Sequence, residues 1–158
     1  MLRPAVDADR DTVLSWRNHP EVRRVSLTTQ VIGDAEHAAW WRAATTDPGR
    51  RVLVYEDDGV PAGVVIFDLR PDPPTWSFYL DVAGLGGALL PAWLRLEDEA
   101  VRYAFGDLGL DRLGGETLAW NTGVLALHRR FGFRETRRYE REVDGTAQTV
   151  VWTERGRS

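Results

Sequence analysis

The sequence contains no cysteine, and this absence excludes several kinds of chemistry at once. Without thiols the chain forms no disulfide, holds no thiolate-bound metal and has no cysteine nucleophile. Lysine is also absent, and all 20 basic residues are arginines. We attribute this bias to the base composition of the coding genome. No apolar run approaches the ~18 residues of a membrane span, and the first residues lack a signal-peptide core. We therefore expect a cytoplasmic protein that does not act at a membrane.

The charge balance gives no strongly basic surface. The formal net charge is -4 at pH 7, and the arginines are scattered along the chain, so we expect no nucleic-acid partner. A length of 158 residues with 43% hydrophobic residues suits one globular domain with a sizeable core. No linker or internal repeat is visible. We therefore expect residues 1–158 to form a single domain.

Hydrophobic periodicity and turn signals predict alternating strands and helices. Alternation predicts strands at residues 2–6, 51–56, 61–69, 75–80, 112–120, 134–143 and 148–154. Helical spacing predicts helices at residues 7–18, 34–44, 91–107 and 122–130, with Pro20 ending the first and Asn121 capping the last. This order predicts an α/β (α+β) domain with a mixed sheet and flanking helices.

A glycine-rich loop precedes the third predicted helix. The run from Gly84 to Gly87 lies where free N–H groups and the positive end of the helix dipole favour an anion, and glycines allow close approach of a phosphate. No Gly-Lys-Ser/Thr follows, which excludes a P-loop, and the loop does not open the first unit of a dinucleotide fold. The alternative is a turn that only starts the helix.

Several segments together resemble the GCN5-related N-acetyltransferase (GNAT) superfamily. They are "WSFYL", "GLGG", "YAF", "LAWN" and "HRRFGF", and the order of strands and helices agrees over nearly the whole chain. The resemblance implies a mostly antiparallel sheet that splays between its fourth and fifth strands, and acetyl-CoA as the acetyl donor without a metal. Within the family, "LSWRNHPEVRR" and "GGETLAWN" resemble the branch of ribosomal-protein and pseudaminic-acid-pathway amino-sugar N-acetyltransferases, with the amino-sugar group favoured.

The resemblance also implies where the coenzyme lies. The family's pyrophosphate motif is Arg/Gln-x-x-Gly-x-Gly/Ala, and Gly84 and Gly86 fit it, but Asp81 stands where Arg or Gln is expected and would repel a phosphate. A shifted register would use residues 87–90, just ahead of Pro91; both registers place the anion at the same helix start. The coenzyme-binding residues expected from the resemblance are Phe78, Tyr79, Leu80, Gly84, Leu85, Gly86, Gly87, Ala88, Leu89, Asn121 and Arg129.

His128 is the candidate catalytic acid. The family motif Tyr-x-x-x-Gly-Phe reads here as "HRRFGF", so His128 replaces the Tyr that resemblance places near the thioester sulfur. A thiol of pKa ~8.5 leaves readily as a thiolate, and an imidazolium can protonate it. The alternative is a structural histidine stabilised by the helix C-terminus. The base that deprotonates the amine is left open among Glu116, His37 and Asp68, with Glu116 as our first choice.

The first two predicted helices carry the candidate acceptor site. Aromatic side chains there suit a sugar or a base, and arginine suits a diphosphate, although Trp16 and Trp41 also occupy core-facing helical positions. We expect direct acetyl transfer to a primary amine of a small molecule, such as a nucleotide-linked amino sugar. The alternatives are a protein N-terminus as acceptor, or a non-catalytic acyl-CoA-binding module. Exposed terminal strands make a homodimer plausible. The expected substrate-binding residues are Trp16, Arg17, Asn18 and Trp41.

Overall fold

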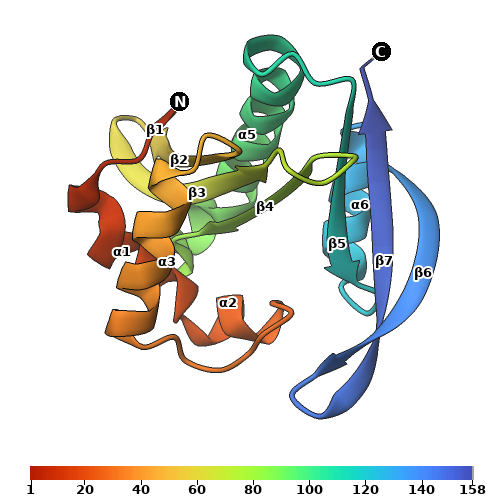
Figure 1. Cartoon of the computed structure of the whole chain (residues 1–158), viewed down its shortest axis with the longest axis horizontal. Helices are drawn as coiled ribbons and strands as arrows, with labels where there is room; N and C mark the ends of the chain where they lie inside the picture. The colour runs from red at the N-terminus through yellow and green to blue at the C-terminus, as the bar shows by residue number, and fades with distance from the viewer. Residues whose placement is uncertain (158) are drawn as a thin grey trace.

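The computed structural model describes residues 1–157 and is built on a seven-stranded sheet of order β1-β2-β3-β4-β5-β7-β6 (Figure 1). Neighbouring strands are antiparallel except for β4 and β5, which are parallel. The expected mixed, mostly antiparallel sheet is therefore confirmed. The strands are β1 (Leu2–Pro4), β2 (Arg50–Asp57), β3 (Val60–Asp68), β4 (Thr75–Leu80), β5 (Arg112–Leu118), β6 (Arg134–Val143) and β7 (Thr146–Gly156).

Helices cover both faces of the sheet (Figure 1). Short 3-10 turns precede α1 and α5, at Asp7–Asp9 and Gly86–Ala88, and a π-helical turn at Tyr103–Asp107 follows α5. In the described part of the chain, no helix is long and apolar enough to cross a membrane. The α-helices are α1 (Arg10–Arg17), α2 (Pro20–Arg24), α3 (Asp34–Thr46), α4 (Val82–Leu85), α5 (Leu89–Arg102) and α6 (Thr122–Arg130).

The prediction missed two short helices, α2 and α4. We expected Pro20 to end the first helix, but α1 already ends at Arg17 and Pro20 begins α2. Proline is tolerated in the first turn because its missing N–H would have no partner there. His19 caps α2, since its Nδ1 accepts the backbone N–H of Glu21 at 3.1 Å. Local capping therefore outweighed the helix-breaking signal.

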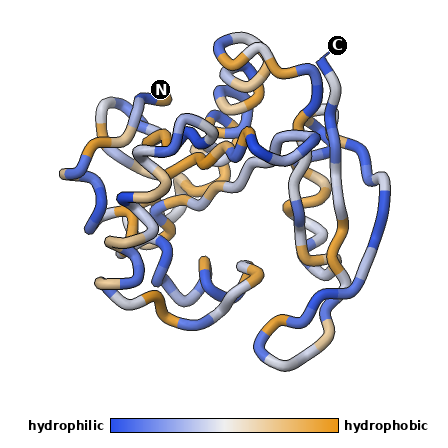
Figure 2. The backbone as a smooth tube through the Cα atoms, in the orientation of Figure 1, coloured by the Kyte–Doolittle hydropathy of each residue, from blue (hydrophilic) through white to orange (hydrophobic). Residues whose placement is uncertain are grey.

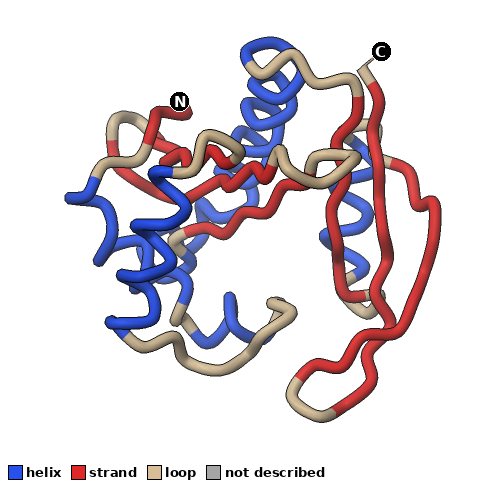
Figure 3. The backbone as a smooth tube through the Cα atoms, viewed as in Figure 1, coloured by secondary structure: helices blue, strands red, loops and turns tan. Residues whose placement is uncertain are grey.

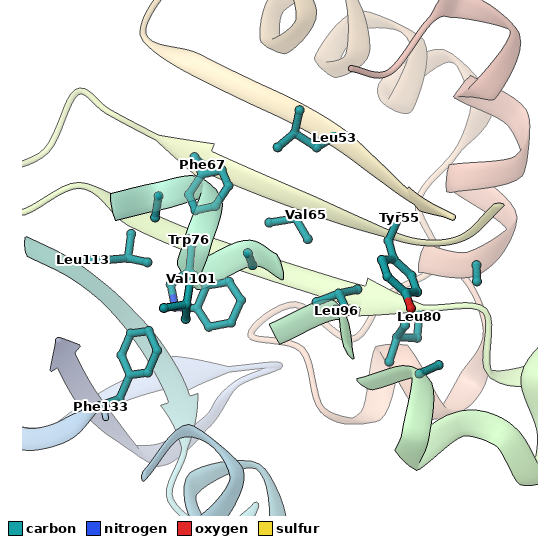
Figure 4. Close-up of a cluster of buried hydrophobic side chains, with 14 residues drawn as sticks. Leu53, Tyr55, Val65, Phe67, Trp76, Leu80, Leu96, Val101, Leu113 and Phe133 are labelled. Atoms are coloured by element: carbon teal, nitrogen blue, oxygen red, sulfur yellow. The ribbon is translucent and has the colours of Figure 1, made fainter. Parts of the chain in front are cut away.

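The two faces of the sheet have separate hydrophobic cores. On one face, α5 packs against β2, β3 and β4 through residues such as Leu96, Val65 and Phe67, all buried (Figure 4). On the other face, α1 and α3 pack against β2 and β3 through Trp16 and Trp41, which are 5% and 3% exposed. We call the face of the sheet that α5 covers the α5 side, and the face that α1 and α3 cover the α3 side.

The parallel strands β4 and β5 meet at one point and then separate. Their one pairing among the described residues joins Thr75 to Gly114, and the Gly114 N–H donates to the Pro74 carbonyl at 2.9 Å. Gly114 is required there, because a Cβ would lie 2.3 Å from the Trp152 ring. Beyond this contact, the strands diverge and leave a gap between β1–β4 and β5–β7 (Figure 3). The expected splay between the fourth and fifth strands is confirmed.

Candidate active site

A cavity of about 690 Å³ occupies the gap between β4 and β5, a volume typical of small-molecule sites. Side chains alternate along β4, so Trp76 and Phe78 line its α5 side whereas Ser77 and Tyr79 line its α3 side. Past Thr75 and Gly114, the backbone edges that face the gap have no strand ladder joining them in the described chain. The cavity therefore connects both faces of the sheet and exposes strand backbone to a ligand.

His128 lines this cavity from α6 and is paired with a buried carboxylate. Its Nδ1 is hydrogen-bonded to Oε1 of Glu97 on α5, and the two side chains are 6% and 0% exposed. Glu97 Oε2 has no hydrogen-bond partner among residues 1–157. Because Glu97 occupies Nδ1, Nε2 is the ring nitrogen left for chemistry in the cavity.

The spacing of the "HRRFGF" motif has a direct structural cause. The N–H of Phe133 donates to the His128 carbonyl at 3.0 Å, and the N–H of Gly132 donates to the Arg129 carbonyl at 3.0 Å. These two bonds form a Schellman cap at the end of α6, with Gly132 in the left-handed region at φ +89°. The cap requires glycine four residues after His128, and it turns the chain into β6.

Aromatic rings hold His128 in place. Its ring centroid lies 5.5 Å from that of Trp76, 6.0 Å from Phe78 and 5.6 Å from Phe133. The Phe133 contact joins the two ends of the Schellman cap, as such caps commonly do. Phe133 is 1% exposed, and Phe131 packs against the same core, so both phenylalanines are core residues. The imidazole is thus fixed by packing on one side and by Glu97 on the other.

Asn121 stands at the N-cap position of α6 without capping it. Its side chain accepts no cap hydrogen bond from the described backbone. It instead contributes to the lining of the cavity, together with Val124 from the same helix. The expected capping role is therefore wrong, and the amide is left to face a ligand.

The glycine loop is folded into short helical turns rather than an open loop. Asp81 caps α4, and its Oδ1 accepts the Gly84 N–H at 2.9 Å. The N–H of Gly84 is therefore bonded to Asp81, the carboxylate that was expected to repel a phosphate at this position. An added Cβ at Gly86 or Gly87 would meet no described atom within 4 Å, although the Gly86 N–H is already bonded to the Val82 carbonyl. Leu89, at the start of α5, lines the cavity directly.

Glu116 lies on the α3 side of the cavity but is already engaged. Its carboxylate accepts from Arg141 Nη1 at 2.9 Å and from the Tyr139 hydroxyl. Burial and the neighbouring Glu116 raise the pKa of Tyr139 to about 12, so its hydroxyl keeps its proton and donates it in a hydrogen bond to the Glu116 carboxylate. Both partners lie on β6, so the Glu116 side chain connects β5 to β6.

Arg17 and Tyr79 face each other on the α3 side. Arg17 Nη2 donates to the carbonyl and hydroxyl of Thr28, each at 2.9 Å, while its buried Nη1 has no partner in the described chain. Burial lowers the pKa of Arg17, and burial raises the pKa of Tyr79 well above its usual value. An incompletely bonded guanidinium beside a cavity favours an anionic or hydrogen-bond-accepting ligand group.

The other sequence-predicted substrate residues do not line the cavity. Trp16 and Trp41 lie in the α3-side core, where Trp41 Nε1 donates to Asp7 at 3.2 Å. Asn18 bonds both the N–H and the carbonyl of Ile32, which fixes the loop between α2 and α3. Arg129 is exposed on α6, outside the residues that line the cavity. Of the four predicted substrate residues, the structure brings only Arg17 to the site.

Sequence reasoning missed Glu97 and Trp93, and it left Arg24 open between a diphosphate-binding residue and a surface residue. Glu97 lies in the acidic run "EDE", a pattern typical of a solvated face, yet it is four residues after Trp93 and four before Val101, which are apolar. That helical spacing is the signal that identifies it as inward-facing. Trp93 lines the α5 side, and Arg24 stacks on the Trp120 ring at 5.1 Å at the edge of the cavity. The Arg24 contact joins α2 to the end of β5, which no local pattern predicts.

Comparison with solved structures places this fold among acetyltransferases. A protein provisionally assigned as a phosphinothricin N-acetyltransferase is 26% identical, with a TM-score of 0.81, and the match covers 100% of this chain and 98% of that one. The ribosomal-protein-alanine N-acetyltransferase of Brucella melitensis is 21% identical (TM-score 0.80; 99% of both chains). The spermidine N-acetyltransferase of Vibrio cholerae, solved with CoA and spermine, is 16% identical (TM-score 0.83; 98% and 93%). A search of curated proteins finds no significant match.

The splayed sheet and its cavity define an acyltransferase fold. Residues 1–134 match the family model of the acetyltransferase (GNAT) domain, and the chain belongs to this family. It is therefore an acetyl-CoA-dependent N-acetyltransferase that acts on amines. The family resemblance found in the sequence is confirmed.

Proposed function

We propose that the cavity acetylates the primary amine of a small molecule by direct attack within a ternary complex. The observation that carries this proposal is the position of His128 at a gap that is open to both faces of the sheet. The α5 side would hold the donor and the α3 side the acceptor. Holding two reactants on opposite sides of one opening converts their reaction into an effectively unimolecular step.

Acetyl-CoA fits the α5 side in most respects. The gap-facing backbone of Phe78, Tyr79 and Leu80 would pair with the pantetheine arm, and Asn121 adds a free amide beside it. The uncrowded backbone at Gly87 would receive the pyrophosphate at the start of α5. We favour the register of residues 87–90 over that of Gly84 and Gly86, whose N–H groups are bonded to Asp81 and Val82.

His128 would act as the general acid. Bound acetyl-CoA supplies the activated acetyl group, and the departing sulfur needs a proton. Glu97 accepts a hydrogen bond from Nδ1–H, which directs Nε2 into the cavity and stabilises the imidazolium. Glu97 is thus a positioning residue for His128 rather than a group that touches substrate. The rings of Trp76 and Phe133 would exclude water from this proton transfer.

The closed shape of the α3 side favours a small acceptor over a protein N-terminus. The segment after α2 bridges the gap, because Leu27 packs against the core of Leu118, Val143 and Val150 while Arg24 stacks on Trp120. A peptide would need an open groove here. Trp40 offers an aromatic surface and Arg17 an incompletely bonded guanidinium, which suit a nucleotide-linked amino sugar. The amino-sugar branch therefore remains our proposal.

Two alternatives have specific observations behind them. The fold is similar to a ribosomal-protein-alanine N-acetyltransferase, which keeps a protein N-terminus as the second acceptor candidate. Asp81 near the expected pyrophosphate position and the missing Tyr at position 128 motivate the other alternative, a chain that binds acyl-CoA without catalysis. The charged outer edge of β6 (Figure 2) is of the kind that discourages strand pairing, so we do not extend the proposal to a dimer through β6.

Mass spectrometry of reaction mixtures tests the acceptor class. The purified protein is incubated with acetyl-CoA and one class of acceptor in each reaction. The acceptors are nucleotide-linked amino sugars, polyamines and peptides with free N-termini. We expect N-acetylated nucleotide sugar and free CoA. Acetylated peptide with unmodified sugars would move the chain to the ribosomal-protein branch. Tight CoA binding with no acetylated product of any kind would support the non-catalytic module.

A further inference from the structure

His37 is a buried imidazole without a structural hydrogen bond. It lies on α3, is 3% exposed and lines the α3 side of the cavity. Neither Nδ1 nor Nε2 has a hydrogen-bond partner within residues 1–157. A buried polar group left without a partner costs free energy, and such groups in folded proteins usually have a ligand or a functional role. The packing of the fold therefore does not account for a histidine at this position.

The surroundings of His37 favour a neutral ring. The rings of Trp40 and Trp41 lie 5.6 Å and 5.9 Å away and bury it. Burial lowers the pKa of His37, and the positive charge of Arg10 lowers it further.

Charges of both signs surround this side of the cavity. Against the effect of Arg10, the carboxylates of Asp11 on α1 and Asp34 on α3 act in the opposite direction and are weaker. Arg17, Tyr79 and Glu36 share the cavity wall, from α1, β4 and α3. The net effect leaves an uncharged imidazole near pH 7, the form that accepts a proton.

The other two candidate bases are already bound to arginines. Glu116 is held by Arg141 and by the Tyr139 hydroxyl. Asp68 accepts two hydrogen bonds from the Arg70 guanidinium, each at 2.8 Å, and does not line the cavity. Arg70 lowers the pKa of Asp68, which makes that carboxylate a weaker base. Of the three, only His37 has ring nitrogens without a hydrogen-bond partner among residues 1–157.

We propose that His37 is the general base that takes the proton of the acceptor amine, a proposal that rests on the acetyl transfer described above. The bound ammonium first gives one proton to His37, directly or through one water, and His37 releases that proton to solvent. The neutral nitrogen then forms a bond to the acetyl carbon, the carbon–sulfur bond breaks, and the sulfur gains a proton from His128. The nitrogen loses its second proton to solvent as the amide forms and His128 recovers one from solvent, so an ammonium releases one net proton and an amine that is already neutral does not need the His37 step.

The test compares two small amines that differ in charge. Ethylamine is protonated at pH 7 and needs a base, whereas hydroxylamine is neutral and needs little help. We expect His37→Gln, which keeps hydrogen-bonding atoms, to lower the enzymatic rate with ethylamine by about 100-fold and with hydroxylamine by far less. The wild-type rate with ethylamine should fall as the pH drops through the pKa of His37, and the variant should lose this limb. An equal loss with both amines, or no loss, overturns the proposal.

His19→Asn is the matched control. His19 caps α2 outside the cavity lining, and Asn is a good N-cap, so this variant should keep both rates. Histidine NMR gives a readout without turnover: the His37 ring should be neutral at pH 7, and its signals should shift when ethylamine alone is added. If the wild type acetylates no amine, the proposed function fails and the base role of His37 fails with it. If the wild type is active but the His37 signals do not move on addition of ethylamine, the His37 inference alone is overturned.

Discussion

His128 and Glu97 form a buried imidazole–carboxylate pair that joins α6 to α5 across the α5 side of the cavity. Glu97 is fully buried, and its Oε2 has no partner in the described structure. An ionised carboxylate in such surroundings needs an opposite charge, and His128 is the group in contact with it. The pair therefore explains why α5 carries an inward-facing glutamate and supports the proposal that His128 is the acid.

Replacing Glu97 by glutamine should slow the reaction without weakening coenzyme binding. Glutamine keeps the shape but removes the charge that supports an imidazolium, so we expect kcat to fall by about 100-fold. The dissociation constant of CoA, measured by calorimetry, should change by less than about twofold, since Glu97 does not line the cavity. Asp98→Asn, on the exposed side of the same helix, is the control and should keep full activity. A similar loss in both variants would contradict the positioning role.

The same pair makes a prediction about stability. Changing His128 alone to leucine leaves Glu97 buried and unpaired, which should cost about 3–5 kcal/mol in the free energy of unfolding. The double variant Glu97→Leu with His128→Leu should lose clearly less, because replacing both partners by apolar groups is often near neutral. Urea denaturation measures both. A double variant no more stable than the single one would show that packing, not charge, dominates.

Removing the charge of Asp81 should strengthen coenzyme binding. Asn in place of Asp81 can still accept the Gly84 N–H but no longer repels a phosphate. One unit charge a few ångströms away in water is worth about 1 kcal/mol, so the Kd of CoA should fall by roughly fivefold. The gain should shrink at high salt, because screening weakens the repulsion. Unchanged affinity would place the pyrophosphate away from Asp81.

The join between β4 and β5 should not tolerate a side chain at Gly114. Alanine there would place Cβ 2.3 Å from the Trp152 ring, and such overpacking typically costs about 1–3 kcal/mol. Gly123, in the first turn of α6, has no described atom within 4 Å of an added Cβ. Gly123→Ala is therefore the control and should be neutral or slightly stabilising. Thermal unfolding of the two variants compares them directly.

The sequence predicts local features of this molecule better than long-range contacts. Alternation identified all seven strands. The resemblance of "HRRFGF" to a family motif singled out His128, and the spacing from His128 to Gly132 is that of a Schellman cap, which is a local structure. Glu97 was missed because three consecutive acidic residues look solvent-exposed, although only the first faces inward. The tryptophans of α1 and α3 could fill either the core or the site, and only tertiary packing decides that Trp16 and Trp41 are core residues whereas Trp40 lines the cavity.

In the mechanism that we propose, His128 lies at the splay between β4 and β5 and protonates the departing thiolate. The most direct test is acetyl transfer by His128→Ala, followed as CoA release and as N-acetylated product, with the Kd of CoA measured on the same protein. We expect kcat to fall by about 100-fold or more while the CoA affinity stays nearly unchanged. A variant that acetylates the amine at the wild-type rate would contradict it.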